Sequence, residues 1–523
     1  MSGQARRHFV CALDDILDGA GVAALVDGEQ VALVRVGEEI FALENRDPFS
    51  GANVMARGLA GDLQGQLVVS SPVYKQHFSL RTGRCLEDEA VGLRTWPCGV
   101  LDGRVWVESL PQVATAARGR RRLVVIGNGM AAMRTIEELL NEAPDVYDIT
   151  IFGAEPRGNY NRILLSPLLA GETGREQIVL HPLQWYSDRG ITLHVGDSVV
   201  SIDRRQKRVI SAAGIVAGYD RLLLATGSEP VRLKVKGHDL SGVFYFRNLD
   251  DVDGMQLQAA NARQAVVIGG GLLGLEAASG LRKLGLDVTI VHIRDRVMDK
   301  QLDAEAASYL RASMESRGIG FRLAARTEAI VGEGRVQSVR LEDGTSLAAD
   351  MVVVAAGITP RTELARSCGL HCDRGILVDD TLQTYDPAIY AVGECVQHRG
   401  ATYGLVAPLW EQARVCAAHL AERGVSRYRG SSPASQLKVS GIAVFSAGDP
   451  AKARGSESIR YADRAAGVYK RLWVHENRLL AAVLYGDTRN AAWYAELIEQ
   501  QRNISPWREQ LMLGEPPVPE SVA

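Results

Sequence analysis

The sequence predicts an α/β protein, in which two similar α/β domains stand between a small all-β domain and a small α+β domain. Three observations predict this arrangement. Strand-like and helix-like runs alternate from Leu123 onward, which is typical of parallel sheets covered by helices. Two glycine-rich turns of one kind lie in the middle of the chain, and short β-rich runs precede them. A chain of 523 residues is also too long for a single hydrophobic core.

The overall composition excludes several classes of partner. The chain is 46% hydrophobic and 23% charged, and its formal net charge is −3, which gives no reason to expect nucleic acid or an anionic membrane as a partner. The longest apolar runs have the length of strands, so no membrane span is expected. Arg6 and Arg7 are followed by no apolar segment of the kind found in secretory signals, and the cytoplasm is the expected location.

The cysteines do not indicate a disulfide framework or a metal site. There are seven, an odd number, and they are scattered along the chain. Cys368 and Cys372 form an isolated pair, whereas an iron–sulfur cluster usually takes about four thiolates. We therefore expect no metal site and no disulfide chemistry at these residues.

The first domain is expected to be all-β and to cover residues 1–112, with a linker at 113–120. Turn dipeptides separate its short β-rich runs, for example Asp27-Gly28 and Asp102-Gly103. The predicted strands are Ala23–Val26, Val31–Val36, Ile40–Leu43, Leu67–Val69 and Val105–Val107.

The first glycine turn follows the predicted strand Leu123–Ile126 and opens a helix. It reads Gly127-x-Gly129-x-x-Ala132. In such a turn the first glycine allows a tight bend, the second lets the backbone approach a pyrophosphate, and the small third residue packs the helix on the strand. The next strand, Ile149–Phe152, leads to Glu155, which is placed to accept ribose hydroxyls. The pattern predicts a nucleotide site.

The second glycine turn repeats this pattern. It follows the strand Ala265–Ile268 and consists of Gly269, Gly271 and Gly274. Two such turns imply two nucleotides, and we expect FAD at the first and a nicotinamide cofactor at the second.

The residue that follows the next strand, Asp287–Val291, bears on the choice between NADH and NADPH. An acid there favours NADH, and a base favours the 2′-phosphate of NADPH. The position is held by His292, with Arg294, Asp295 and Arg296 after it. These charges could bind a phosphate or could simply be solvated, so the choice stays open.

Two further motifs are typical of flavin enzymes with this architecture. Leu222–Leu224 runs into the turn Ala225-Thr226-Gly227, and Ile389–Val392 runs into Gly393-Glu394. Gly357, after the strand Met351–Ala356, is expected to contact a cofactor as well.

With these motifs the sequence resembles the two-dinucleotide-domain flavoprotein reductases related to the pyridine nucleotide–disulfide oxidoreductases. The resemblance implies two Rossmann-like three-layer ββα domains. The helix after the first glycine turn has no cysteine, so electrons are expected to leave directly from the flavin. The expected limits are 121–243 and 353–427 for the FAD-binding domain, 244–352 for the NAD(P)H-binding domain and 428–523 for the α+β domain and tail.

The stretches 152–167, 269–277, 391–400 and 437–449 are similar to the flavin half of the large subunit of assimilatory NAD(P)H nitrite reductase. This resemblance implies that Asn161 and Arg162 lie beside the flavin. Pro167 stands where the ferredoxin-reductase branch usually has Lys. The cluster cysteines and sirohaem domain of the full nitrite reductase subunit are missing, so nitrite reduction is not expected on this chain alone.

The N-terminal domain resembles the small subunit of the same enzyme, which has a Rieske-type fold. A Rieske cluster needs Cys-x-His and Cys-x-x-His. The matching segments here run from Asn45 to Asp47 and from Ser71 to Tyr74, and all four ligand positions are replaced. His77 and Cys85 stand at the wrong offsets. We expect no Fe–S cluster and hypothesise that the domain docks the reductase to a partner or positions an electron acceptor.

The resulting prediction is an FAD-dependent oxidoreductase that takes a hydride from NADH or NADPH and passes electrons to a nitrate or nitrite reductase catalytic subunit. Glu276 either lines the nicotinamide pocket or caps its helix. The C-terminal domain is expected to complete the flavin pocket or to form a homodimer interface. The alternatives are a reductase for ferredoxin, rubredoxin or another small redox protein, and a nucleotide-binding redox sensor or assembly protein without turnover.

Overall fold

The structure is a computed structural model that describes residues 6–63, 65–88, 91–111, 120–422, 426–431, 435–439, 441–449, 453 and 455–514. The expected linker at 113–120 lies outside the described residues except for Arg120, and so does the end of the chain from residue 515.

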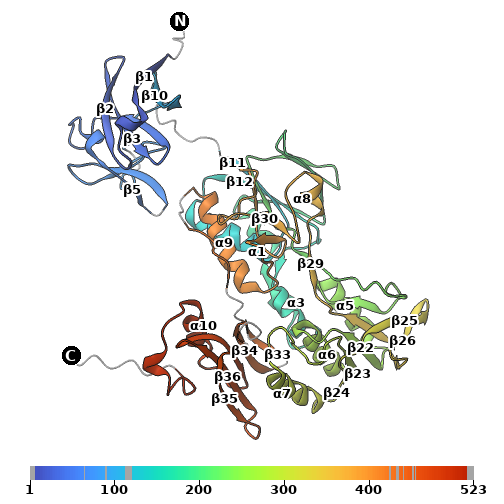
Figure 1. Ribbon diagram of the computed structural model, residues 1–523. Helices are drawn as coiled ribbons and strands as arrows, with labels where there is room; N and C mark the ends of the chain where they lie inside the picture. The colour runs from blue at the N-terminus through green and yellow to red at the C-terminus, as the bar shows by residue number, and fades with distance from the viewer. Residues whose placement is uncertain are drawn as a thin grey trace.

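The first domain is all-β, as the sequence predicts, and is drawn in blue in Figure 1. Its strands form three antiparallel sheets with the orders β1-β10-β9, β2-β3-β4-β8 and β5-β6-β7. The turn dipeptides act as expected: Asp27 and Gly28 have φ of 46° and 85°, and Asp102 and Gly103 have φ of 49° and 72°. Two successive residues with positive φ make the tight hairpin turns that suit twisted strands.

The elements of this domain are β1 Arg7–Ala12, η1 Leu13–Asp15, β2 Gly21–Val26, β3 Glu29–Val36, β4 Glu39–Glu44, η2 Met55–Arg57, β5 Leu59–Leu63, β6 Gln66–Ser70, β7 His77–Ser79, β8 Thr95–Trp96, β9 Cys98–Leu101 and β10 Arg104–Glu108. Alternate residues of β3 and β4 face opposite sides, so Val34 and Leu43 join one buried cluster while Leu33 and Ala42 join another.

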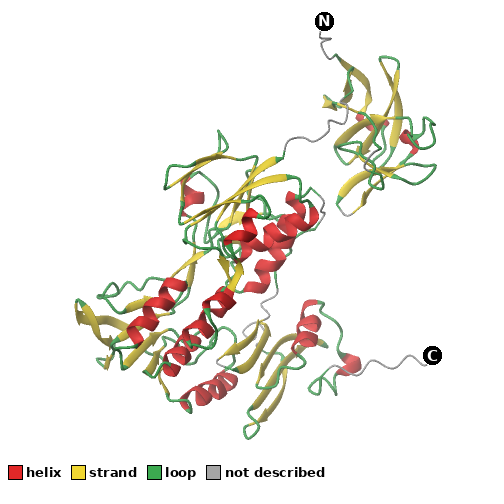
Figure 2. Ribbon diagram, turned by 180° about the vertical axis from the view of Figure 1, so that it is seen from behind, coloured by secondary structure: helices red, strands yellow, loops and turns green. Residues whose placement is uncertain are grey.

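The second part of the chain is built on a five-stranded parallel sheet with the order β15-β12-β11-β19-β31. Helices α1 and α9 pack together beside this sheet (Figures 1 and 2). A small antiparallel sheet, β16-β17-β18, lies close to β11. The elements are β11 Arg121–Ile126, α1 Met130–Glu142, β12 Tyr147–Gly153, β15 Thr192–Val195, β16 Val199–Asp203, β17 Arg208–Ser211, β18 Val216–Gly218, β19 Arg221–Leu224, β31 Ile389–Ala391 and α9 Val406–Leu420.

A second five-stranded parallel sheet has the order β21-β28-β22-β23-β24. Buried residues on its two faces belong to different clusters: Val267 and Ile290 pack toward the helices, and Val266 and Val291 pack toward the antiparallel sheet β25-β26-β27. The elements are β21 Val243–Tyr245, α5 Leu249–Ala259, β22 Gln264–Ile268, α6 Leu272–Lys283, β23 Asp287–Val291, α7 Ala304–Glu315, β24 Ile319–Arg322, β25 Thr327–Glu333, β26 Arg335–Leu341, β27 Ser346–Ala348 and β28 Met351–Val354.

The last part of the chain forms an antiparallel five-stranded sheet with the order β33-β34-β37-β36-β35, followed by a helix. Its elements are β33 Ser435–Val439, β34 Ile442–Gly448, β35 Glu457–Asp463, β36 Val468–His475, β37 Arg478–Tyr485, α10 Ala491–Glu499 and η4 Ser505–Trp507. β36 pairs with β37 in antiparallel fashion, with Tyr469 opposite Tyr485 and Trp473 opposite Ala481. Tyr469, Ala481 and Val483 share a buried cluster with Leu310 of α7, so this sheet packs on the second α/β unit.

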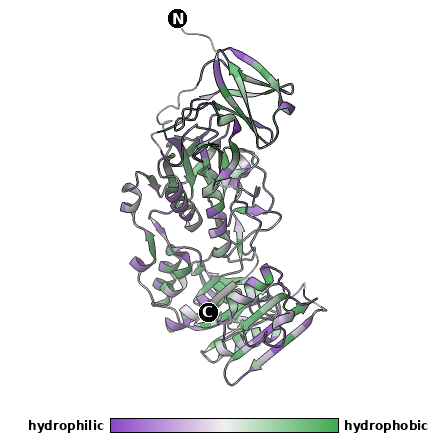
Figure 3. Ribbon diagram, turned by 90° about the vertical axis from the view of Figure 1, so that its left-hand side faces the viewer, coloured by the Kyte–Doolittle hydropathy of each residue, from purple (hydrophilic) through white to green (hydrophobic). Residues whose placement is uncertain are grey.

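Short elements complete the chain: β13 Asn159–Tyr160, η3 Arg162–Leu164, α2 Leu165–Leu169, α3 Arg175–Ile178, β14 Val179–His181, α4 Leu183–Ser187, β20 Ser228–Pro230, β29 Ile358–Pro360, α8 Glu363–Ser367, β30 Ile376–Val378 and β32 Val396–His398. Figure 3 shows hydrophobic residues concentrated along the strands inside each unit. No helix among the described residues has the length and apolar character needed to cross a membrane.

Candidate functional site

The first glycine turn has the geometry that its sequence predicts. Gly127 follows β11 with φ of 110°, and a Cβ on it would lie 2.2 Å from the carbonyl oxygen of Ala225. Both facts require glycine there. Gly129 is the N-cap of α1, and a Cβ on it would meet no atom within 4 Å. The turn is therefore tight against β19, and open space lies where α1 begins.

Three segments converge at this turn because their strands are neighbours in one sheet. The turn Ala225-Thr226-Gly227 follows β19, and Gly393 follows β31. A Cβ on Gly393 would lie 3.0 Å from that of Ala131 in α1. Ala132, the third small residue of the motif, is fully buried. The carboxyl ends of parallel strands are where α/β sheets bind ligands.

A polar side chain inside the turn was not predicted. The Asn128 carbonyl oxygen Oδ1 accepts a 2.8 Å hydrogen bond from the hydroxyl of Tyr186, and its Nδ2 is buried without a hydrogen-bond partner among the described residues. A buried donor without a partner is costly in a protein interior. Asn128 thus has a buried donor that is close to the end of β12, because a Cβ on Gly153 would lie 3.9 Å from this Nδ2. The signal that could have found it is the polar residue between the two glycines.

A network of ion pairs connects the predicted acids. Glu155 accepts a 2.8 Å hydrogen bond from the Tyr160 hydroxyl and forms an ion pair with Arg162. Arg162 also donates to the carbonyl oxygen of Arg247 at 3.0 Å. Glu394 is paired with the same Arg247. The structure therefore brings Glu155 and Glu394, far apart in sequence, into one cluster through two arginines.

The remaining predicted residue of this region has a local role. The side chain of Asn161 accepts a 3.0 Å hydrogen bond from the backbone N–H of Ile163 and caps the helix η3. Its own N–H donates to the carbonyl oxygen of Ile178 at 2.7 Å, which joins β13 to the end of α3. Asn161 thereby fixes the backbone that carries Arg162.

The second glycine turn repeats the first. Gly269 has φ of 130°, and a Cβ on it would lie 2.2 Å from the carbonyl oxygen of Ala355. A Cβ on Gly274 would lie 2.0 Å from the carbonyl oxygen of Gly269, so α6 packs closely on the turn. Gly271 is the N-cap of α6 and, like Gly129, faces open space. Gly357 has φ of 118° and accepts a hydrogen bond from Val231 at 3.0 Å.

One hydrogen bond joins the region of the first turn to the helix of the second. The Ser166 hydroxyl in α2 donates to Glu276 Oε2 in α6 at 2.7 Å. Burial raises the pKa of Glu276 above its ordinary value, and the hydrogen bond from Ser166 opposes that rise. The expectation that Glu276 caps α6 is not met, because the N-cap is Gly271 and no side chain caps this helix. The carboxyl group is instead held toward α2.

Three family models match the chain. The model described as pyridine nucleotide-disulphide oxidoreductase matches residues 121–419, more than half of the sequence. The chain belongs to this family. A Rieske-like [2Fe-2S] domain model matches residues 8–108, and a rubredoxin NAD+ reductase C-terminal domain model matches residues 433–502. The predicted fold class is thereby confirmed, together with the resemblance on which it was based.

Similar proteins of known function occur in Bacillus subtilis. The chain is 46% identical over 387 residues to a nitrite reductase [NAD(P)H], covering 74% of this chain and 48% of that protein. It is 44% identical over 393 residues to an assimilatory nitrate reductase electron transfer subunit, covering 75% and 51%. The chain thus spans about half the length of these relatives. The crystal structure of a covalent putidaredoxin reductase–putidaredoxin complex matches with a TM-score of 0.69 and 27% identity, covering 77% of this chain and 97% of that one.

Members of this oxidoreductase family bind FAD and NAD(P)H, and the residues present fit both groups. At each site a glycine N-cap leaves open space before a helix whose first N–H groups have no intrahelical partner, which is the environment that a pyrophosphate needs. The unpartnered Nδ2 of Asn128 adds a donor at the first site. Of the seven cysteines, all of which are described, none forms a disulfide.

The four positions at which the ligands of a Rieske cluster are expected carry other residue types. At the four matching positions stand Asn45, Asp47, Ser71 and Tyr74. Ser71 donates a 2.6 Å hydrogen bond to the buried Asp47, and Asn45 accepts one of 2.8 Å from the Ala56 N–H. Tyr74 is 61% exposed. Hydrogen bonds therefore connect the two loops that a cluster would join, and no thiolate or imidazole stands at these four positions.

His77 and Cys85, which stand at the wrong offsets for a Rieske cluster, both contact Glu87. His77 Nδ1 lies 2.5 Å from Glu87 Oε1, and the thiol of Cys85 donates to the same carboxylate at 3.4 Å. The structure shows no group of three or more potential metal ligands among the residues it describes.

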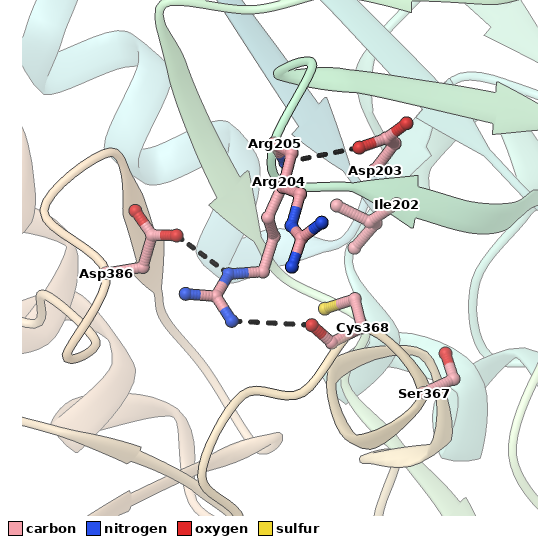
Figure 4. Close-up of a pocket in the computed structure, with 7 residues that line it drawn as sticks. All are labelled: Ile202, Asp203, Arg204, Arg205, Ser367, Cys368 and Asp386. Atoms are coloured by element: carbon pink, nitrogen blue, oxygen red, sulfur yellow. Dashed lines mark hydrogen bonds and ion pairs between the residues drawn. The ribbon is translucent and has the colours of Figure 1, made fainter.

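A separate cavity of about 550 Å³ lies between β16 and the end of α8 (Figure 4). Its basic residue Arg204 is already used, because Nε donates to Asp386 at 2.7 Å and Nη1 donates to the carbonyl oxygen of Cys368 at 3.4 Å. Burial raises the pKa of the Cys368 thiol. The cavity contains no residue of either glycine turn, and we assign no ligand to it.

Proposed function

We propose that this chain is an FAD-dependent NAD(P)H oxidoreductase that serves as the electron-input component of assimilatory nitrate or nitrite reduction. The observation that carries the proposal is the Ser166–Glu276 hydrogen bond of 2.7 Å, which ties the segment after the first nucleotide turn to the helix of the second. A transfer between two cofactors requires that their reactive ends meet, and we infer that this bond helps to hold the two halves of the proposed site together.

The residues of the chain would bind and orient the two cofactors. FAD, when bound, would supply the chemistry that accepts a hydride and releases electrons. At the first site, we assign the backbone of Gly127, Gly129 and Ala132 to the pyrophosphate and Glu155 to the ribose hydroxyls. At the second site, Gly269, Gly271 and Gly274 have the corresponding role.

The network around Arg247 would shape the rest of the flavin site. Glu394 accepts a 2.8 Å hydrogen bond from Ser228 and is paired with Arg247. Arg162 neutralises Glu155 and reaches the Arg247 backbone. We propose that a ribose or ribitol hydroxyl takes up the free acceptor positions on these carboxylates, while the arginines hold them ionised.

The electron acceptor is proposed from the relatives. The two Bacillus subtilis proteins carry nitrite reductase and nitrate reductase electron transfer in their names. A reductase for rubredoxin is the second candidate, because a rubredoxin NAD+ reductase C-terminal domain model matches residues 433–502. We propose a cytoplasmic location for either function, because NAD(P)H is the reductant.

We propose that the N-terminal domain holds no cluster and docks the partner rather than carrying electrons. Phe49, Val73 and Tyr74 are exposed on the two loops that the Asp47–Ser71 hydrogen bond joins. Exposed apolar side chains gathered on fixed loops are typical of interaction sites. Deleting residues 1–112 should slow electron transfer to the partner and leave reduction of an artificial acceptor unchanged. If transfer to the partner keeps its full rate, the docking role is wrong.

The function is tested by recording the spectrum of the purified chain and mixing it anaerobically with NADH or NADPH. Rapid bleaching of a flavin spectrum supports the proposal. The reduced protein is then mixed with the catalytic subunit of a nitrate reductase, with that of a nitrite reductase, or with rubredoxin. The acceptor that reoxidises the flavin fastest decides between the candidates. A protein without flavin, or with a flavin that neither nucleotide bleaches, would contradict the proposal and favour a sensor or assembly protein.

A further inference from the structure

The loop after β23 folds back onto the second glycine turn. The N–H of Gly270 donates to His292 Nδ1 at 3.1 Å, and the N–H of Met298 donates to the carbonyl oxygen of Gly270 at 2.8 Å. A Cβ on Gly270 would lie 2.7 Å from Cγ of His292. The imidazole of His292 therefore packs against the glycine turn, and Asp299, the residue after Met298, is held beside the same turn.

The hydrogen bonds of His292 indicate whether its imidazole is neutral or cationic. Its Nδ1 accepts from Gly270, and its Nε2 lies 3.3 Å from Asp299 Oδ1, to which it donates. An imidazole that accepts at one nitrogen and donates at the other is neutral, because both nitrogens of the cation are donors. His292 in this arrangement is not a cation available to a phosphate. It acts instead as a spacer between the turn and the carboxylate.

Each arginine of the same loop faces an acid. Arg296 Nη1 lies 3.1 Å from Asp295, and Arg294 Nε lies 4.0 Å from Asp299 Oδ2 with its side chain 69% exposed. Arg296 Nε is buried and has no hydrogen-bond partner among the described residues. This guanidinium is the group that a 2′-phosphate would use, but Asp295 already balances its charge. Lys300, which follows Asp299, is exposed.

We propose that Asp299 is the carboxylate that accepts the adenosine ribose hydroxyls at the second site, and that the protein selects NADH over NADPH. The acid at this position usually follows the second strand directly, and here it comes seven residues later through a folded loop. Its Oδ1 is occupied by His292, which leaves Oδ2 for a hydroxyl. A 2′-phosphate at the same place would put its negative charge beside this carboxylate.

This proposal rests on the proposed function, because it names the nucleotide of the same site. Its test measures binding rather than turnover. Isothermal titration of the full-length flavoprotein with ADP-ribose and with 2′-phospho-ADP-ribose gives the ratio of the two dissociation constants. The experiment uses the unaltered protein and the variants Asp299→Asn, Asp299→Glu and Asp287→Asn. The last removes one negative charge at the start of β23, where Asp287 is paired with Arg282, and serves as the matched control.

We expect the unaltered protein to bind ADP-ribose at least tenfold more tightly than its 2′-phosphate. Asp299→Asn should lose roughly tenfold to a hundredfold of that preference, as expected for a lost hydrogen bond to a charged acceptor. Asp299→Glu should retain most of it, and Asp287→Asn should leave it within about threefold, within the scatter of such contributions. Flavin content and thermal unfolding should stay unchanged in all three, which separates a local effect from misfolding.

Equal or tighter binding of the 2′-phosphate by the unaltered protein would overturn the selectivity. An unchanged ratio in Asp299→Asn, or an equal loss in Asp287→Asn, would overturn the role of Asp299. Failure of both ligands to bind would instead contradict the proposed function itself. The same variants mixed anaerobically with NADH and NADPH should show the same order of preference in the rate of flavin bleaching.

Discussion

The two N-cap glycines offer a sharp test of the nucleotide sites. Gly129 has φ of −85° and ψ of −180°, and Gly271 has φ of −81° and ψ of −178°, which alanine adopts without strain. An added Cβ meets no protein atom within 4 Å at either position. Gly129→Ala and Gly271→Ala should therefore change the free energy of unfolding by about 1 kcal/mol or less.

Each methyl group would nevertheless occupy the space through which the backbone approaches a pyrophosphate. Loss of two charge-assisted hydrogen bonds costs about 3–6 kcal/mol, which corresponds to binding weaker by roughly a hundredfold to ten-thousandfold. We expect Gly129→Ala to be purified largely without flavin, and Gly271→Ala to keep its flavin but to bind ADP-ribose poorly. The flavin-to-protein ratio, isothermal titration and thermal unfolding measure the three quantities.

Gly127→Ala provides the contrast. Its Cβ would lie 2.2 Å from the Ala225 carbonyl oxygen at a φ of 110°, so the fold itself should lose about 1–3 kcal/mol from backbone strain alone. The reasoning is refuted if Gly129→Ala retains its full flavin content. It is equally refuted if Gly271→Ala loses flavin while Gly129→Ala loses only affinity for ADP-ribose. It is also refuted if Gly127→Ala is as stable as the unaltered chain.

Three further predictions concern the rest of the chain. Burial alone would raise the pKa of Asp47, but hydrogen bonds from Ser71 and Phe49 hold it below its ordinary value. Asp47→Ala should destabilise the N-terminal domain by about 2–3 kcal/mol, which faster proteolysis of residues 6–111 would reveal. A chelator added to the unaltered protein should leave this proteolysis rate unchanged. The pKa of Glu276 is raised by burial, so its ionisation weakens folding as pH rises above about 4.5. The melting temperature of Glu276→Gln should therefore rise relative to that of the unaltered chain between about pH 4 and about pH 7. A difference in melting temperature that stays constant over this range would contradict the prediction. Arg399 and then His398 lower the pKa of Asp380 to about 2. The ionised carboxylate therefore stabilises the fold above its ordinary pKa, and this contribution is lost as pH falls toward about 2. Asp380→Asn should have a lower melting temperature than the unaltered chain near neutral pH, and the two melting temperatures should converge in acid.

Local sequence patterns predicted the turns well because their chemistry is local. The first glycine of each nucleotide turn, Gly127 or Gly269, is required by a positive φ and by a carbonyl oxygen 2.2 Å from an added Cβ, and such constraints can be read from a short motif. The hairpins at Asp27-Gly28 and Asp102-Gly103 were predictable for the same reason.

The carboxylate network was not predictable, because its members come from distant segments. Arg247 reaches Glu394 across 147 residues, and Ser166 reaches Glu276 across 110. Asp299 lies beside the second turn because Met298 and His292 are both hydrogen-bonded to Gly270 and His292 contacts Asp299. No periodicity or spacing in the sequence signals these contacts, which follow from strand order and loop folding.

The limits of the second parallel sheet also differ from those expected. The sequence places the NAD(P)H-binding domain at 244–352, whereas the strands of this sheet run from Val243 to Val354. Val353 and Val354 pair with Phe244 and Tyr245 of β21, so a boundary at 352 would cut through β28. An apolar run such as 351–356 shows that a strand is present but not which of two neighbouring sheets it joins.

The way each end of the chain is anchored has a consequence for building chimaeras. Among the described residues, the two apolar clusters of the N-terminal domain include no member beyond Val107. The C-terminal sheet instead shares a cluster with α7, and Tyr469 and Arg471 both donate to Asp303, the N-cap of that helix. The first hundred residues can therefore be exchanged as a cassette between reductases, whereas transplanting the last hundred requires carrying α7 with them.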